Sequence, residues 1–217
     1  ADSLFLEKDD SLIVLKLSFN NEYESFTQQT EDYFFDIRPN VAWMSKLSVS
    51  YRFISAAVSY KIPFIPGNED NDKKGTTKKL NFSFRFSSGR WTQDLHLGKV
   101  KGFYLHNTEE VIQDWDPDDP YFQLPGLTVY RGGGSTTFQL NRNYSFKAIS
   151  TQTQRQLKSC GSPMFTALYD FYRIDNEGPP GTDRYQRSDN FEGLLSAGYY
   201  YTFVLKSHWY AGMGAMA

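Results

Sequence analysis

The sequence predicts an all-β fold: an antiparallel up-and-down transmembrane β-barrel, formed as a single domain over residues 1–217. Three observations predict it. Apolar and polar residues alternate with a period of two, the candidate strands are long, and their connections alternate between short and long. Aromatic residues make up 17% of the chain although the mean hydropathy is -0.55. Large rings are therefore interleaved with polar residues, as in a sheet with one apolar and one polar face.

Nine strands are expected, in order, at residues 11–20, 41–50, 53–62, 78–87, 90–99, 135–149, 162–174, 192–205 and 208–217. The third, fourth and eighth alternate most regularly, through Ile54–Ile62, Leu80–Phe86 and Leu195–Leu205. In the sixth, Arg142 interrupts an apolar face and indicates a bulge. Many of these segments have nine or more residues, which is the length that a tilted membrane-spanning strand requires.

The connections between these strands differ in length in a regular way. Tight turns are expected at Tyr51-Arg52, Ser88-Gly89 and 206–207, and a medium one at 150–161. Long connections are expected at 21–40, 63–77, 100–134 and 175–191, with Gly132-Gly133-Gly134 as a flexible hinge before a strand. Short periplasmic turns and longer outer loops are typical of outer-membrane barrels. This pattern places the N-terminus in the periplasm.

The two faces of the strands differ in chemistry. Lipid-facing positions are assigned to Phe82, Phe84, Phe86, Tyr199, Tyr201 and Phe203. A polar network in the lumen is assigned to Lys46, Lys61, Arg85, Asp94, His96, Lys147 and Asp170. The long side chains of this face predict a plugged lumen, because small barrels are filled by side chains. Alternation alone also fits a soluble sandwich, but strand length, loop alternation and aromatic content favour the membrane barrel.

Composition excludes several classes of protein. The chain has 23 Lys and Arg against 25 Asp and Glu, a net charge of -2 and no long basic run, so we expect no nucleic-acid partner. The longest uncharged apolar-leaning stretch, Gly193–Leu205, is too short for a transmembrane helix. Cys160 is the single cysteine and cannot form an internal disulfide. The start at Ala1-Asp2-Ser3 is typical of a chain after removal of a signal peptide.

The end of the chain leads to a separate expectation. Nine strands would leave the last one, with Trp209, Ala211, Met213 and Ala215 on one face, running parallel to the first. Single-chain bacterial barrels have an even number of strands, and an open edge in lipid leaves backbone groups unpaired. We therefore expect the given sequence to lack one or three strands of a 10- or 12-stranded barrel.

Several segments resemble the DUF4421 family, uncharacterised outer-membrane barrel proteins of Bacteroidota. The segments are 51–55 (YRFIS), 63–68 (PFIPGN), 99–105 (KVKGFYL), 146–149 (FKAI) and 152–159 (QTQRQLKS). The resemblance runs from about residue 11 to the end. It implies an outer-membrane location and no particular reaction, and family members look longer than this chain.

Two groups of residues could carry chemistry. Asp94 and His96 share a face and are the catalytic candidates of a lipid-modifying barrel enzyme, although no nucleophile motif accompanies them and Arg85 can pair with Asp94 instead. Asp114, Asp116 and Asp118 space carboxylates as calcium loops do, and calcium there could bridge lipopolysaccharide phosphates. The loop lacks the glycine and distal glutamate of an EF-hand, which favours an ordinary solvated loop.

The resulting hypothesis is a non-enzymatic outer-membrane barrel, structural or an accessory subunit of an envelope complex, without cofactors. Its expected partners are outer-membrane lipid, lipopolysaccharide, and other outer-membrane or periplasmic proteins, the last through residues 151–159. Lys99 and Lys101, expected just past the outer end of a strand, either bind lipid phosphates or mark the membrane boundary. The alternatives are the barrel enzyme and a soluble lipocalin-like carrier.

Overall fold

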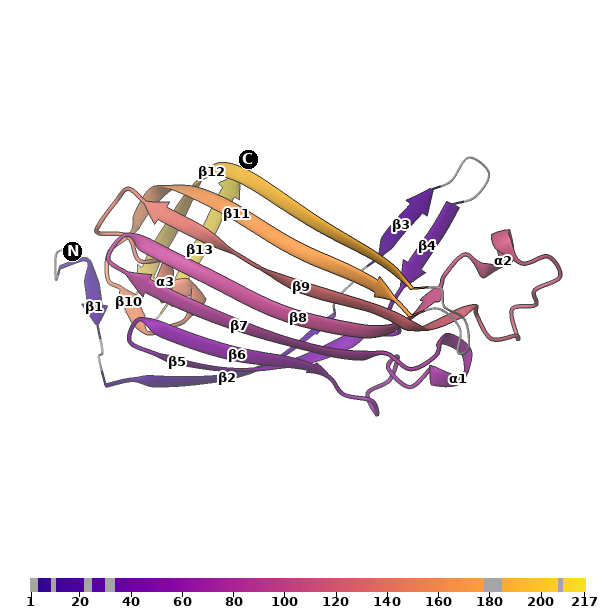
Figure 1. Cartoon of the computed structure of the whole chain (residues 1–217). Coiled ribbons are helices and arrows are strands. Elements are labelled where there is room, and N and C mark those ends of the chain that lie inside the picture. Colours follow the sequence, from indigo (N-terminus) through magenta and orange to yellow (C-terminus); the bar gives the residue numbers. More distant parts are fainter. Residues whose placement is uncertain (1–3, 9–10, 22–24, 30–33, 178–184, 207–208) are drawn as a thin grey trace.

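The computed structural model describes residues 4–8, 11–21, 25–29, 34–177, 185–206 and 209–217 (Figure 1). Nine strands form one antiparallel meander in which each strand pairs with the next. They are β2 (Ile13–Asn21), β5 (Trp43–Tyr51), β6 (Ile54–Lys61), β7 (Lys78–Ser88), β8 (Trp91–Leu105), β9 (Gln123–Gln139), β11 (Cys160–Asn176), β12 (Gln186–Lys206) and β13 (Trp209–Met216).

Four short strands and three short helices lie at the ends of this sheet. β3 (Phe26–Gln29) and β4 (Phe34–Arg38) form a hairpin attached to the end of β8, and β1 (Leu6–Lys8) pairs with β10 (Gln154–Gln156). The helices are α1 (Asn71–Lys74), α2 (Thr108–Val111) and α3 (Phe146–Ser150). In Figure 1, β3, β4, α1 and α2 lie at the right, which we call the loop end. β1, β10 and α3 lie at the left, which we call the turn end.

The all-β antiparallel prediction is confirmed, and the strand count is corrected from nine to 13 within the described residues. The four additional strands have three to five residues each, too few for alternation to identify them. In the described part of the chain, β2 pairs with β5 alone and β13 with β12 alone, so the sheet is open and its two edge strands run in the same direction. The predicted strand at 208–217 is β13, and residue 208 lies outside the described residues.

The predicted strand at 135–149 and the loop at 100–134 are wrong. β8 continues to Leu105 and β9 already begins at Gln123, so the connection between them is 106–122. Residues 132–134 are not a hinge but the middle of β9, paired with both β8 and β11. A Cβ on Gly134 would overlap the carbonyl oxygen of Asp94, so glycine is needed there for close strand approach.

The second half of that predicted strand forms other structure. The chain leaves the sheet after Gln139 and forms α3, so no bulge lies at Arg142. The helix begins after Ser145, whose Oγ accepts a hydrogen bond from the backbone N–H of Ala148 at 3.3 Å. The apolar residues in this stretch fit a short helix as well as a strand. The N-cap hydrogen bond of Ser145 favours the helix.

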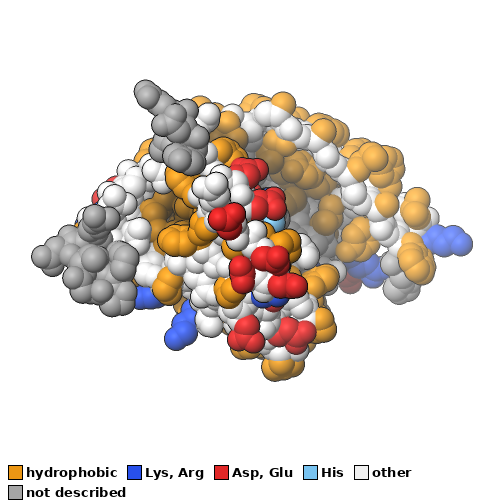
Figure 2. All heavy atoms as spheres, turned by 90° about the vertical axis from the view of Figure 1, so that its right-hand side faces the viewer, with side chains coloured by type: hydrophobic (Ala, Val, Ile, Leu, Met, Phe, Trp, Pro, Cys, Tyr) orange, Lys and Arg blue, Asp and Glu red, His pale blue; other side chains and the backbone are white. Residues whose placement is uncertain are grey.

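Strand pairing carries two chemically different faces across the sheet. Phe82 pairs with Val58 and Leu97, and Phe84 with Ala56 and Leu95, on what we call the outer face. Arg85, Asp94 and His96 lie on the opposite, inner face. Exposed large apolar side chains of the outer face include Leu15, Leu17, Phe19, Leu47, Val49, Ile54, Leu80, Phe82, Phe84, Phe86, Leu95, Leu97, Phe165, Phe171, Phe191, Leu195, Tyr199, Phe203 and Met213. Figure 2, which views the loop end, shows the sheet as an arch with a largely hydrophobic outer surface.

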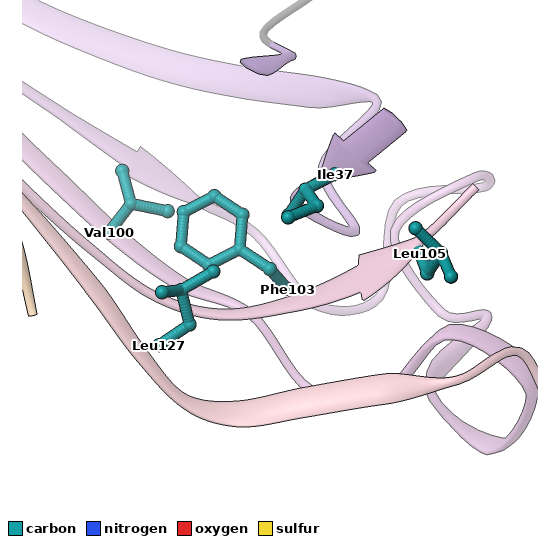
Figure 3. Packing of buried hydrophobic residues seen from close by; sticks show 5 residues of the cluster. All are labelled: Ile37, Val100, Phe103, Leu105 and Leu127. Carbon is teal, nitrogen blue, oxygen red and sulfur yellow. The ribbon is translucent and has the colours of Figure 1, made fainter. Parts of the chain in front are cut away.

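The buried apolar residues form two small clusters, one at each end of the sheet. At the loop end, Ile37 of β4 packs with Val100, Phe103 and Leu105 of β8 and Leu127 of β9 (Figure 3). The turn-end cluster consists of Tyr144, Cys160 and Met164. Within the described residues, the long middle of the sheet therefore has no buried apolar cluster, and most of its large apolar residues face outward. Leu168 and Leu194, which pair on the inner face, are exceptions.

A β-bulge at Gly102 makes the loop-end cluster possible. In a regular strand Val100 and Phe103 would point to opposite faces, but the register shifts between Lys101 and Phe103 and both side chains enter the cluster. Gly102 has φ +89, and the backbone oxygen of Thr76 lies against its Cα. The Thr77 hydroxyl donates to the carbonyl oxygen of Gly102 at 2.7 Å and fixes the bulge.

Replacing Gly102 by alanine is expected to destabilise the protein by about 1–3 kcal/mol, because a side chain is strained at this φ and would overlap Thr76. Urea denaturation, followed by tryptophan fluorescence, measures this loss. Gly89→Ala is the control, since Gly89 also has positive φ (+59) but open space around its Cα. Equal losses in the two variants would contradict the role assigned to the contact with Thr76.

Candidate functional site

The polar inner face is organised by two groups of ion pairs. In the first, the Arg85 guanidinium of β7 binds the Asp94 carboxylate of β8 through two nitrogen atoms, with Nη2 to Oδ2 at 3.0 Å. The two residues are direct partners in the strand register. Bidentate binding fixes both side chains and neutralises their charges within the sheet.

The second group is centred on Asp170 of β11. Its carboxylate accepts hydrogen bonds from Arg131 Nε and Nη2 at 2.9 and 3.0 Å, and its Oδ1 lies 2.9 Å from His96 Nε2. The group thus joins β8, β9 and β11 across the inner face. Arg131 was not among the predicted network residues because residues 100–134 were assigned to a loop. The alternation of Thr128 and Tyr130 with Val129 and Arg131 could have identified this strand.

The three remaining predicted network residues come from three other elements. Lys46 of β5 lines a cavity of about 310 Å³ that Arg85 and Asp94 also line. Lys61, at the end of β6, donates to the carbonyl oxygen of Asn40 at 2.6 Å, near the loop end. Lys147 is not on a strand but on α3, a correction that follows from the serine cap described above.

Helix α3 lies over the inner face at the turn end and contacts two strands that are far apart in the sheet, β7 and β13. Lys147 Nζ donates to the carbonyl oxygen of Ser87 in β7 at 2.8 Å, and the Arg85 guanidinium carbon lies 5.7 Å from the centre of the Phe146 ring. On the other side, the Tyr210 hydroxyl of β13 donates to the Ala148 carbonyl at 3.3 Å. The side chain of Ile149 lies against Gly212. The helix therefore bridges β7 and β13.

A web of side-chain to backbone hydrogen bonds holds the segment around α3. Gln139 Nε2 donates to the Tyr144 carbonyl, and Gln156 Nε2 to the Asn143 carbonyl, each at 2.9 Å. Gln156 Oε1 also accepts from the backbone N–H of Ser145 at 2.9 Å. We call residues 140–157 the plug segment, since they lie at the turn end of the inner face, beside a cavity of about 370 Å³. The web makes its placement specific.

Tyr144 is nearly fully buried beside Cys160 and Met164. Its hydroxyl and that of Thr202 are both buried, and neither has a hydrogen-bond partner of good geometry among the described residues, although the two lie close together. Burial raises the pKa of Tyr144, because the phenolate would lose its hydration. Cys160, a free thiol, is buried in the same place.

Replacing Tyr144 by phenylalanine is expected to leave stability at neutral pH unchanged or higher, because it removes an unpaired buried hydroxyl. Since the folded state keeps the phenol proton beyond the pH at which the unfolded chain releases it, the parent protein should lose stability as pH rises above about 10. The variant should lack that part of the loss. Denaturation midpoints between neutral and alkaline pH measure the difference. Tyr210→Phe, which removes a hydrogen bond to α3, should lose about 1 kcal/mol at neutral pH.

Each of the two catalytic candidates has a side-chain partner on a neighbouring strand or across the inner face. Asp94 is bound by Arg85, and His96 contacts Asp170 rather than Asp94. Within the described residues, the interactions of His96 include no serine or threonine hydroxyl. Ser83 is the partner of His96 in the strand register, but among the described residues no hydrogen bond joins the two. The arrangement is thus an ion-pair network rather than a histidine bound to a serine hydroxyl.

The acidic loop candidates lie between α2 and β9 at the loop end, where acidic side chains gather in Figure 2. Asp116 Oδ1 accepts from the backbone N–H of Asp118 at 2.9 Å, and the Asp118 carboxylate lies 3.6 Å from Lys73 Nζ. Asp114 adopts a positive φ of 69. No group of three or more His, Cys, Asp or Glu side chains in the described ranges could hold a metal ion.

The outer face carries all six residues assigned to lipid. Phe82, Phe84 and Phe86 are 42–48% exposed, and Tyr201 and Phe203 pack with ring centroids 4.5 Å apart. Tyr199 and Phe203 are also largely exposed. No helix in the part of the chain that the structure describes is long and apolar enough to cross a membrane.

Fold and faces together define an antiparallel, single-layer β-sheet protein that carries most of its large apolar residues on the outer face and has a short helix at one end of its polar face. The chain belongs to the DUF4421 family, described as a domain of unknown function, whose model matches residues 1–217. The comparisons with curated proteins and with solved structures gave no match.

Proposed function

We propose that this chain is a non-enzymatic outer-membrane β-barrel protein with a plugged lumen, acting as a structural or accessory subunit of the cell envelope. The observation that carries the proposal is the outer face, where exposed Phe, Leu, Val and Tyr side chains continue from β2 to β13. Lipid is the surrounding that such a surface fits, since exposed apolar patches of this extent mark membrane or protein contact.

The surface area supports the same proposal. The chain has 13726 Å² of accessible surface, whereas a compact soluble protein of this mass has about 10,000 Å². The additional accessible area comes from a sheet whose outer face is not packed against a second layer of described residues. The buried clusters lie at its two ends, which fits ends in water and a middle in lipid.

Closure of the sheet is part of the proposal. β2 and β13 are both edges of the described sheet and run in the same direction. Antiparallel closure between them needs an odd number of additional strands. One or three additional strands would give a 10- or 12-stranded barrel. From the lengths of the tight turns and of the longer loops we propose that the turn end and the N-terminus lie in the periplasm and the loop end outside.

The plug segment supports a lumen that does not conduct. It bridges β7 and β13 across the inner face through contacts of Lys147 and Ala148. Barrels of about eight strands have interiors just wide enough for side chains. In the wider barrel proposed here, a helix of five residues and its flanking segments would occupy part of the added width. A role in supporting or docking with other envelope proteins follows better from this arrangement than transport.

The experiment that tests the proposal expresses the chain with an export signal, separates the membranes and extracts them with detergent. The protein should be found in the outer-membrane fraction, should need detergent to stay in solution, and should migrate differently on gels before and after heating. A monomer that stays soluble without detergent would overturn the membrane assignment and favour the lipocalin-like carrier.

A second measurement tests the non-enzymatic part of the proposal. Purified protein is incubated with outer-membrane lipids, which are then compared by mass spectrometry with lipids incubated with an Asp94→Asn variant. Unchanged lipids in both samples are expected. A lipid modification that is present with the parent protein and lost with the variant would overturn this part.

A further inference from the structure

A cluster of lysines lies where the apolar outer face meets the loop end. Lys99 of β8 pairs with Leu80 of β7, and Lys101 pairs with Lys78, so the three lysines occupy two consecutive rows of the outer face. The next row toward the turn end is the apolar pair Phe82 and Leu97. We call Lys78, Lys99 and Lys101 the lysine cluster. Prediction from the sequence placed Lys99 and Lys101 beyond a strand, whereas both lie within β8.

The lysine cluster carries more positive charge than its neighbours neutralise. Lys101 Nζ lies 3.3 Å from Glu177 Oε2, and both side chains are about half exposed. Lys99 Nζ lies 5.0 Å from the centre of the Tyr130 ring. Within the described residues, neither Lys78 nor Lys99 contacts an acidic side chain. Among the described residues, the three lysines therefore contact one carboxylate, that of Glu177.

In the same rows of the sheet, the basic residues of β11 and β12 are paired with an acidic residue. Arg173 of β11 lies in the row of Lys99, and its Nε donates to Asp189 Oδ1 at 2.6 Å. Arg187 of β12 binds the other oxygen of Asp189 at 3.0 Å. Basic residues on β11 and β12 thus share a carboxylate from their own hairpin, whereas the cluster on β7 and β8 has an incomplete set of counter-charges.

We propose that the lysine cluster binds the phosphate groups of a phosphorylated membrane glycolipid of the lipid A type. This inference rests on the membrane location proposed above. The cluster lies next to apolar rows, so a lipid whose acyl chains cover Phe82 and Leu97 brings its headgroup phosphates to the ammonium groups. Lysines that only mark the membrane boundary would lay their methylene chains on the apolar surface and keep their ammonium groups in water. Three ammonium groups in two adjacent rows can contact one doubly phosphorylated headgroup.

The test uses the full chain, purified in a zwitterionic detergent, and measures binding of lipid A by native mass spectrometry. The variant Lys78→Gln/Lys99→Gln/Lys101→Gln should bind lipid A more weakly, by about fivefold for each lysine and on the order of 100-fold in total. The matched control is Lys8→Gln/Lys158→Gln/Lys206→Gln, which removes the same charge from exposed lysines at the turn end. It should bind lipid A as the parent protein does.

Two further arms identify the source of the phosphate. Dephosphorylated lipid A should bind as weakly to the parent protein as lipid A does to the cluster variant. Inorganic phosphate in excess over lipid A should displace little of it, because free phosphate lacks the acyl chains. Equal loss in both triple variants, no preference for the phosphorylated lipid, or full displacement by inorganic phosphate would overturn the proposal.

Insertion is measured separately, in phosphatidylcholine vesicles without lipid A. If the parent protein fails to insert, the membrane proposal fails and the lipid site fails with it. If it inserts but the cluster variant binds lipid A normally, the lipid site alone fails. Each triple variant must fold, which is checked by its change in gel mobility on heating. If the cluster variant does not fold, Lys99→Gln alone is used instead, with an expected loss of lipid A binding of about fivefold.

Discussion

Replacing Phe84 by arginine is expected to prevent stable insertion of the protein into a bilayer. Phe84 is 48% exposed in the middle of the outer face, with Ala56 and Leu95 as its partners on the neighbouring strands. An arginine on the lipid face near the bilayer centre costs about 2–4 kcal/mol, which is a large part of the stability of a typical domain. The fraction that inserts into phosphatidylcholine vesicles, read from the gel mobility change on heating, measures the effect.

The same substitution at Phe64 is the matched control. Phe64 is 80% exposed in the connection between β6 and α1, at the loop end and outside every strand. Phe64→Arg should insert as well as the parent protein, because a charge at that position stays in water. If Phe84→Arg folds and inserts equally well, or improves solubility without detergent, the outer face does not contact lipid.

Replacing Gly134 by alanine is expected to destabilise the protein by roughly 3 kcal/mol, through overpacking between β8 and β9. Gly134 pairs with Leu95 on one side and Tyr169 on the other, and a Cβ there would overlap the Asp94 carbonyl oxygen. Moving that carbonyl would also disturb the strand segment that holds Asp94 against Arg85. Urea denaturation in detergent micelles measures the loss.

Gly193 supplies the control within the same row of the sheet. It pairs with Tyr169 from the β12 side, and a Cβ there would meet its nearest neighbour at an ordinary distance of 3.7 Å. Gly193→Ala should therefore change stability by less than about 0.5 kcal/mol. Similar losses at both positions would mean that the glycines matter for backbone freedom rather than for strand approach.

Period-two alternation was sufficient to predict the antiparallel meander and the two faces. The expected positions of Phe82, Phe84 and Phe86 on one face and of Arg85 on the other follow directly from the pleat, which puts successive side chains on opposite sides. The structure also brings Arg85 and Asp94 together, because a two-residue turn at Gly89-Arg90, one residue later than predicted, sets the register between β7 and β8. Side-chain alternation and turn length, which depend on neighbouring residues only, are enough to predict these faces and this pairing.

The sequence alone was not sufficient where tertiary contacts override local preference. Three consecutive glycines suggest a hinge, yet in β9 they allow close approach of β8 and β11 on both sides. Assigning them to a loop removed Arg131 from the predicted network. The position of Lys147 was missed for a related reason. A five-residue helix has too few residues for a helical period to emerge, and its cap is a single serine.

The contacts of α3 have a consequence for the order in which the protein is assembled. Its partners Ser87 and Tyr210 are 60 and 62 residues away along the chain, one before the helix and one after it. If the sheet closes into the barrel proposed above, these contacts must form before closure, because a helix cannot enter a complete ring of strands from the side. The 140–157 segment would then turn inward while β12 and β13 are still being added. The distance between Ser87 and Tyr210 that α3 spans would in that case limit the diameter of the barrel.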